Sequence, residues 1–106
     1  MTLADESTLR HTVAFRLRHP IGSAEESDFL AAAAALDSIP GVTAFEVLRQ
    51  VGRKNSYSYA LSMEFADAAA YAAYDAHPAH QAFVAERWLP EVEDFVEIDY
   101  QAMPSV

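Results

Sequence analysis

The stretch of residues 74–80, Tyr-Asp-Ala-His-Pro-Ala-His, gathers the side chains with the widest chemical range in this chain. It holds Tyr74, His77 and His80. An imidazole can take and return protons near neutral pH, and a phenol can donate a hydrogen bond or a proton to a developing oxyanion. This stretch therefore predicts acid/base chemistry on a small molecule.

The spacing of His77 and His80 also fits a metal pair, because residues three apart share one face of a helix. Zinc prefers three or four ligands, so a third would have to come from His11, Glu97 or Asp99. The intervening proline, Pro78, is expected to break the helix. We therefore expect no metal at this stretch.

Three further candidates lie near the two ends of the chain. His11 begins an alternating apolar run, where it is either a functional group or a partly buried histidine bonded to the backbone. Asp99 lies among apolar residues and needs a partner if it is buried, and a histidine ring would serve. Glu97 shares a face with Asp99 by strand period, and it points either into a pocket or into solvent. These positions are candidates for the same site.

Composition excludes several classes of function. The chain has 106 residues, 16 of them acidic and 7 basic, for a net charge of -9, and it has no cysteine. An acidic chain is a poor partner for nucleic acid or an anionic membrane. Without cysteine there is no disulfide, thiolate zinc site or thiol nucleophile, which fits a cytoplasmic location. No Gly-rich phosphate loop or G-x-S-x-G elbow occurs.

The length suits one domain with one core. We expect this domain to span residues 9–102, between a mobile N-terminal tail at 1–8 and a C-terminal tail at 103–106. The longest apolar run, Phe29 to Leu36, is far shorter than the roughly 20 residues needed to span a membrane.

Hydrophobic periodicity predicts the element order β-α-β-β-α-β. Ser23 with Glu26 forms a capping-box signature, and Asp67 is a second N-cap candidate. The expected strands are 9–18, 42–51, 57–65 and 95–101, and the expected helical segments are 23–38, 67–76 and 79–88, with a turn at 90–94. This order indicates an α+β, ferredoxin-like fold with a four-stranded antiparallel sheet and helices on one face.

The other face of that sheet also carries apolar residues. A second copy of the chain is the simplest cover for it. The sequence therefore predicts a homodimer whose two sheets close a dimeric α/β barrel.

Several phrases together resemble the stress-responsive dimeric α/β-barrel (Dabb) family over about residues 9–102. They are His-Thr-Val-Ala-Phe-Arg-Leu at 11–17, Ile-Pro-Gly-Val at 39–42, the stretch 74–80 and Ile-Asp-Tyr at 98–100. The most specific part is the pattern Tyr-x-x-His-Pro-x-His. The resemblance implies a ferredoxin-like protomer and a face-to-face dimer of sheets.

The resemblance to the family's polyketide cyclases, of the type that makes olivetolic acid, also implies site residues. Tyr74 and His80 match their acid/base pair, Asp99 their histidine-orienting aspartate and His11 their pocket histidine. The implied pocket wall includes Val13, Phe15, Phe29, Leu61 and Phe83. Two departures are Ala32 and Ala33 in place of bulkier side chains and Glu97 in place of an apolar one, which imply a wider and more polar pocket.

These observations favour a small, cofactor-independent acid/base enzyme of the cyclase, aldol or isomerase type. Its substrate would be a carbonyl-rich, polyketide-like or aromatic small molecule, with His77 and Glu97 among the binding residues. His80, oriented by Asp99, would take the proton. One alternative is a non-catalytic stress-responsive or ligand-binding protein in which His77, His80 and Asp99 form a structural network. Another is a cofactor-free monooxygenase, although the chain's single asparagine, Asn55, falls in a predicted hairpin loop and Trp88 reads as core.

Overall fold

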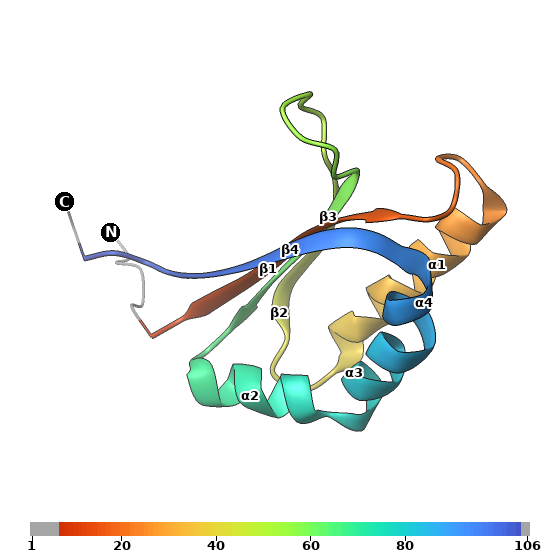
Figure 1. Ribbon diagram of the computed structural model, residues 1–106. Coiled ribbons are helices and arrows are strands. Elements are labelled where there is room, and N and C mark those ends of the chain that lie inside the picture. The colour runs from red at the N-terminus through yellow and green to blue at the C-terminus, as the bar shows by residue number, and fades with distance from the viewer. Residues whose placement is uncertain (1–6, 105–106) are drawn as a thin grey trace.

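The computed structural model describes residues 7–104 and confirms the predicted α+β architecture (Figure 1). A 3-10 turn at Ala35–Ser38 extends the first helix, and a π-helical turn at Val84–Trp88 joins the last two. The strands and helices in chain order are β1 (Leu9–Leu17), α1 (Ala24–Ala34), β2 (Thr43–Arg49), β3 (Tyr59–Phe65), α2 (Ala68–Ala76), α3 (Pro78–Phe83), α4 (Leu89–Glu91) and β4 (Val92–Gln101).

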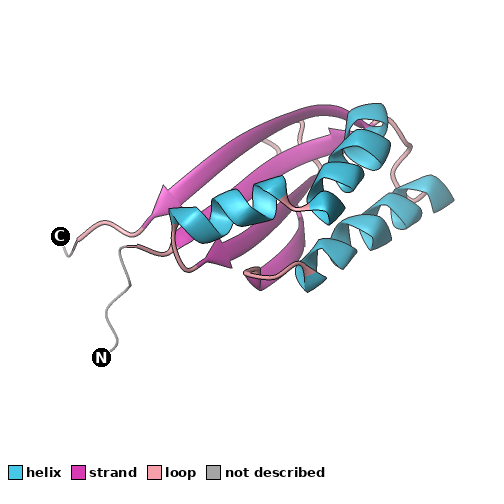
Figure 2. Ribbon diagram, turned by 90° about the horizontal axis from the view of Figure 1, so that it is seen from below, coloured by secondary structure: helices cyan, strands magenta, loops and turns pink. Residues whose placement is uncertain are grey.

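The four strands form one antiparallel sheet in the order β2-β3-β1-β4, so β1 is a central strand. In the register of β1 with its neighbours, His11 lies opposite Met63 on β3 and opposite Asp99 on β4. All the helices of residues 7–104 cover one face of the sheet, and none of them covers the other (Figure 2).

Local signals set the helix starts where the sequence predicts them. The Ser23 hydroxyl accepts a hydrogen bond from the Glu26 amide at 3.1 Å, and a carboxylate oxygen of Asp67 accepts one from the Ala70 amide at 2.8 Å. Each side chain satisfies an amide that has no partner within the first turn of the helix.

The core lies between the sheet and the helices. Alternation along β1 turns Val13, Phe15 and Leu17 inward, and the odd-numbered residues of β3 do the same. The largest fully buried side chains are Phe15, Phe29, Met63 and Phe65. Phe29 and Ala33 of α1 and Leu36 of the following 3-10 turn are buried against the sheet, whereas Leu30 is only half-buried.

Several element boundaries differ from the sequence prediction, and β3, for example, begins at Tyr59 instead of residue 57. The last strand begins at Val92 instead of residue 95, because Val92 is buried opposite Leu17 and the Glu91 carbonyl accepts a hydrogen bond from the Arg18 amide at 2.9 Å. The final predicted helix, 79–88, is α-helical only to Phe83 and continues as a π-helical turn from Val84 through Trp88. Strand β2 is shorter than predicted, and its pairing shifts after Thr43.

The open face of the sheet carries exposed apolar side chains. They are Leu48 on β2 and Val96, Ile98 and Tyr100 on β4, with exposed fractions between 38% and 51%. No helix among residues 7–104 is long and apolar enough to cross a membrane. Most of the predicted N-terminal tail, residues 1–6, lies outside the described residues, as do residues 105–106 of the predicted C-terminal tail.

Candidate functional site

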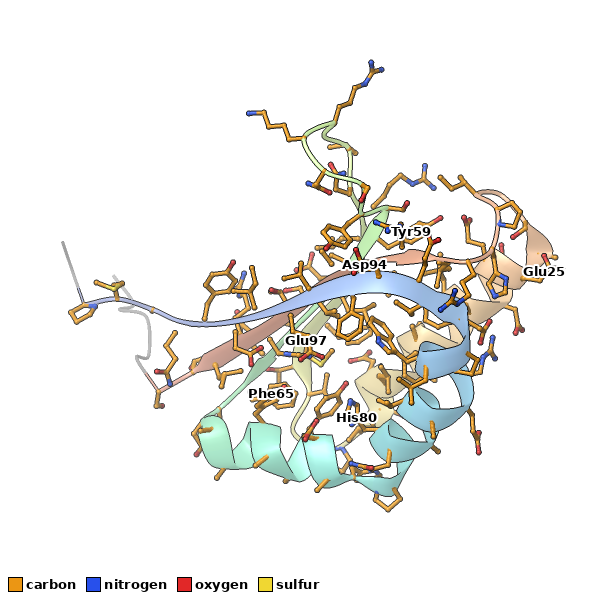
Figure 3. All side chains as sticks on the ribbon, in the orientation of Figure 1. Glu25, Tyr59, Phe65, His80, Asp94 and Glu97 are labelled. Carbon is orange, nitrogen blue, oxygen red and sulfur yellow. The ribbon has the colours of Figure 1, made fainter. Side chains whose placement is uncertain are left out.

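A cavity of about 260 Å³ lies between the sheet and the helical layer. His11 on β1, Tyr74 on α2 and His80 on α3 all line it, so three of the four predicted catalytic residues meet at one space. In Figure 3, His80 on the helices and Glu97 on β4 lie on either side of the gap between the two layers. The structure thus brings together residues that are far apart in the chain.

His11 is buried and paired with Asp99. Its Nδ1 lies 2.6 Å from Asp99 Oδ1, and the two residues are direct cross-strand partners of β1 and β4. A carboxylate can only accept, so Nδ1–H donates and the tautomer of a neutral His11 leaves the Nε2 lone pair free. The ring of Tyr71 lies beside it, with 4.9 Å between the ring centres.

His80 and Tyr74 contact each other through their rings, whose centres are 4.5 Å apart. His80 Nδ1 lies 2.9 Å from the main-chain carbonyl oxygen of Asp75. A carbonyl oxygen can only accept, so Nδ1 carries the proton and Nε2 of the neutral ring is available as a base.

The break between α2 and α3 sets the relation of these two rings. His77 is extended, with a ψ of 136°, as expected for the residue before Pro78. Its Nδ1 accepts a hydrogen bond from the Ala79 amide at 3.0 Å and so caps α3. His77 was expected to bind substrate, but it does not line the cavity and acts as a helix cap.

The prediction that Asp99 orients His80 is wrong in this structure. Asp99 bonds to His11, while His80 bonds to the backbone at Asp75. The predicted network of His77, His80 and Asp99 is also absent, because each of the three makes a separate hydrogen bond. Strand register decides the pairing, since it places His11 directly opposite Asp99.

The predicted wall divides into two groups. Val13, Leu61, Phe83 and Glu97 line the cavity as expected. Phe15 and Phe29 do not; both are fully buried in the core, where their rings contact Trp88 at 5.0 and 6.2 Å between ring centres.

Sequence reasoning missed other lining residues. Met63 could have been found, because it follows Leu61 by the strand period, and Phe95 precedes Glu97 in the same way. Asp75 and Gln81 lie in or next to the stretch 74–80 and carried no signal of their own. The other lining residues not predicted for the site are Leu36, Val84, Trp88 and Leu89. Their inclusion follows from how the helices pack.

Burial and negative charge keep two phenols protonated, that of Tyr74, which lines the cavity, and that of Tyr71, which lies beside His11. Burial is the largest cause that raises the pKa of Tyr74, and the neighbouring groups Tyr71, Asp75 and Glu97 add to it. Burial likewise raises the pKa of Tyr71 to about 12, with further contributions from Asp99, Glu97 and Asp75. Tyr74, at 2% exposed, is therefore a proton or hydrogen-bond donor at neutral pH.

The acidic and histidine side chains do not assemble into a metal centre. Within residues 7–104 no group of three or more such side chains is placed to hold an ion. His77 and His80 do not form the metal pair that their spacing suggested, because the lone pair of His77 Nδ1 already accepts the hydrogen bond that caps α3.

Comparison with known proteins places this chain in a family. Residues 9–102 match the family model Dabb, Stress responsive A/B Barrel Domain. A Dabb family protein with a ferredoxin-like fold from Mesorhizobium loti is 53% identical, with a TM-score of 0.90, over 92% of this chain and 98% of that chain. A comparison with curated proteins finds no match.

Two more distant structures share the fold. A dimeric ferredoxin-like protein of unknown function from Thermobifida fusca is 22% identical, with a TM-score of 0.75, over 90% of this chain and 91% of that chain. Hydroxynitrile lyase from Passiflora edulis is 18% identical, with a TM-score of 0.83, over 96% of this chain and 99% of that chain. With the family match covering nearly the whole chain, this protein belongs to the stress-responsive A/B barrel domain (Dabb) family.

Proposed function

We propose that this protein is a small acid/base enzyme, without a cofactor, that acts on a carbonyl compound by a cyclase, aldol or isomerase reaction. The observation that carries the proposal is the cavity of about 260 Å³ lined by two imidazoles and a buried phenol. A largely apolar cavity with a few convergent polar groups is the usual form of a small-molecule site.

His80 is the proposed base. Its Nε2 takes a proton from the carbon next to a substrate carbonyl, and the electron pair moves to the carbonyl oxygen as an enolate. Tyr74 donates a hydrogen bond to that oxygen, since its raised pKa keeps the phenol protonated. The enolate carbon then attacks a second carbonyl, and the new alkoxide takes the proton back from the His80 imidazolium.

His11 and Asp99 form a second polar pair on the opposite wall. In this proposal His11 binds the second substrate oxygen, and Asp99 is a positioning residue that holds the His11 ring. General acid/base catalysis contributes about two to four powers of ten, and one oxyanion donor about two to three. These magnitudes suit a substrate whose proton is already acidic.

The test measures proton abstraction and ring closure with His80→Ala and Tyr74→Phe proteins. We expect wild-type protein to accelerate deuterium exchange at the methyl group of aryl methyl ketones, or the closure of linear 1,3,5-triketones, as followed by NMR. Each variant should lose about two powers of ten or more in rate, because each removes one catalytic group.

Tyr57→Phe is the matched control, because it removes a phenol that does not line this cavity. The assignment would be contradicted if the wild-type protein reacted no faster than buffer alone, or if both variants reacted at the wild-type rate. Oxygen uptake with a quinol would instead favour a monooxygenase. Asn55 gives that alternative no support, since it lies in a separate groove at the β2–β3 hairpin.

We also propose that the protein acts as a homodimer. Leu48, Val96, Ile98 and Tyr100 expose apolar area on the open face of the sheet, and the Thermobifida fusca structure with this fold is described as dimeric. A second copy packed sheet to sheet would bury these side chains and close the barrel.

A further inference from the structure

The charged side chains around the cavity are carboxylates. Asp75 and Glu97 line it, Asp99 lies behind His11, and no lysine or arginine of residues 7–104 lines it. Three carboxylates face the two imidazoles of His11 and His80, so the site keeps a net negative charge even if both rings are protonated.

Glu97 is the carboxylate most available to a ligand. Among residues 7–104 it makes no hydrogen bond or ion pair, whereas Asp99 is bonded to His11 and Asp75 lies 3.8 Å from His80 Nδ1. Its charge reaches the site, because after burial it is one of the causes that raise the pKa of both Tyr71 and Tyr74.

Apolar side chains make up a second part of the exposed lining, beside the polar Asp75 and Gln81. Leu89 and Phe95 line the cavity and are 65% and 44% exposed, and the Phe95 ring meets Trp88 edge-on with 5.4 Å between ring centres. An entering group thus meets aromatic and aliphatic surface with a free carboxylate beside it. An apolar, uncharged molecule gains from this surface, whereas an anion is repelled at short range.

We propose that the cavity selects for uncharged carbonyl compounds and against carboxylates and phosphates, with Glu97 as a specificity-determining residue. The substrate class is then a free ketone or aldehyde rather than an acid or a phosphate-bearing thioester. As an assignment of substrate the inference rests on the proposed function, but the selectivity is a binding property and is measured without turnover.

The experiment compares two ligands of matched shape, 4-acetylbenzamide and 4-acetylbenzoate. Binding is followed by NMR through the indole N–H of Trp88, the chain's single tryptophan and a lining residue. In wild-type protein we expect the dissociation constant of the benzoate to be at least about tenfold larger than that of the amide. High salt should reduce the difference between the two dissociation constants, because at 1 M the Debye length is only about 3 Å and the repulsion is screened.

Glu97→Gln keeps the shape of the side chain and removes its charge. We expect it to tighten benzoate binding about threefold or more while leaving the amide unchanged. The control is Glu86→Gln, which makes the same charge change at an exposed residue of the helical layer that does not line the cavity. It should leave the ratio of the two constants as in wild type.

Equal binding of the two ligands, tighter binding of the benzoate, no response of Trp88 to either, or identical effects of the two glutamine variants would each overturn the inference. Deuterium exchange at the methyl group of the same amide reports on the proposed catalysis separately. Selective binding without deuterium exchange would contradict the proposed enzyme activity but support the proposed selectivity. Deuterium exchange without selective binding would contradict the selectivity and the role of Glu97 but support the enzyme activity.

Discussion

At the scale of single residues, the decisive feature is which histidine the carboxylate of Asp99 holds. The 2.6 Å contact with His11 Nδ1 fixes one ring, and the Asp75 carbonyl at 2.9 Å fixes His80. Both neutral imidazoles therefore present Nε2 as the free nitrogen. The two imidazoles are thus oriented by different partners: His11 by a carboxylate and His80 by a main-chain carbonyl.

Asp99→Asn tests this arrangement. The amide oxygen can still accept from His11 Nδ1, so the fold should be retained, but the negative charge behind the ring is lost. We expect kcat/KM for the carbonyl substrate to fall about 10- to 100-fold, as for other residues that orient a functional histidine. Steady-state kinetics and the melting temperature measure the two effects separately.

The control for this substitution is Asp37→Asn, which neutralises an exposed carboxylate in the turn after α1. Wild-type kinetics for the Asp99 variant would show that its charge plays no part. An equal loss in the Asp37 variant would assign the effect to net charge instead.

At the scale of elements, the junction of α2 and α3 positions the proposed base, His80, against the proposed donor, Tyr74. α2 ends at Ala76 and α3 begins at Pro78, so Tyr74 and His80 lie on different helices while their rings touch. A single continuous helix would place them six residues apart, on faces about 120° from alignment. The break before the proline is thus what brings the phenol and the imidazole together.

His77 is expected to act on this junction through its cap. His77→Ala removes the acceptor of the Ala79 amide and should cost about 0.5–2 kcal/mol of unfolding free energy, whereas His77→Asn supplies another capping side chain. We expect the alanine variant to lose melting temperature and turnover, and the asparagine variant to recover both.

This pair of variants separates a cap from a substrate contact. If His77 bound substrate instead, asparagine would restore stability without restoring KM. Denaturant unfolding together with KM and kcat for the three proteins gives the answer.

At the scale of the whole molecule, a four-stranded sheet has helices on one face, and no helix of the described residues covers its other face (Figure 2). Thr12, Ala14 and Ala60 on the central strands give that face small side chains, and Leu48, Val96, Ile98 and Tyr100 on the outer strands give it exposed apolar ones. Such a surface is typical of an interface.

Ile98→Lys tests the dimer. Ile98 is 45% exposed on the open face, and in a sheet-to-sheet dimer a lysine at this position would be buried as an unpaired charge. We expect sedimentation or light scattering to show a dimer for wild-type protein and a monomer for this variant at micromolar concentration. Ala73→Lys, on the exposed side of α2, is the control and should remain dimeric. A monomeric wild-type protein would contradict the proposal.

Local signals in the sequence determined the elements and their faces. Ser23 and Asp67 start helices because their side chains satisfy nearby amides, and Pro78 separates two helices because it restricts His77. Period-two alternation gave the buried face of β1 and β3, because successive side chains in a strand point to opposite sides. The ferredoxin-like order follows from these patterns together, whereas the family is shown by the match of residues 9–102 to the Dabb model.

Tertiary structure alone decided the pairings and the empty space. Which histidine meets Asp99 depends on the register of β1 with β4, in which the partners lie 88 residues apart in the chain. The cavity exists because Leu36, Val84 and Leu89 come from helical segments whose packing leaves that volume unfilled. Phe15 and Phe29 were predicted for its wall but are fully buried in the core against Trp88, because which inward side chains border the cavity depends on how the helices pack on the sheet and carries no signature in any single residue.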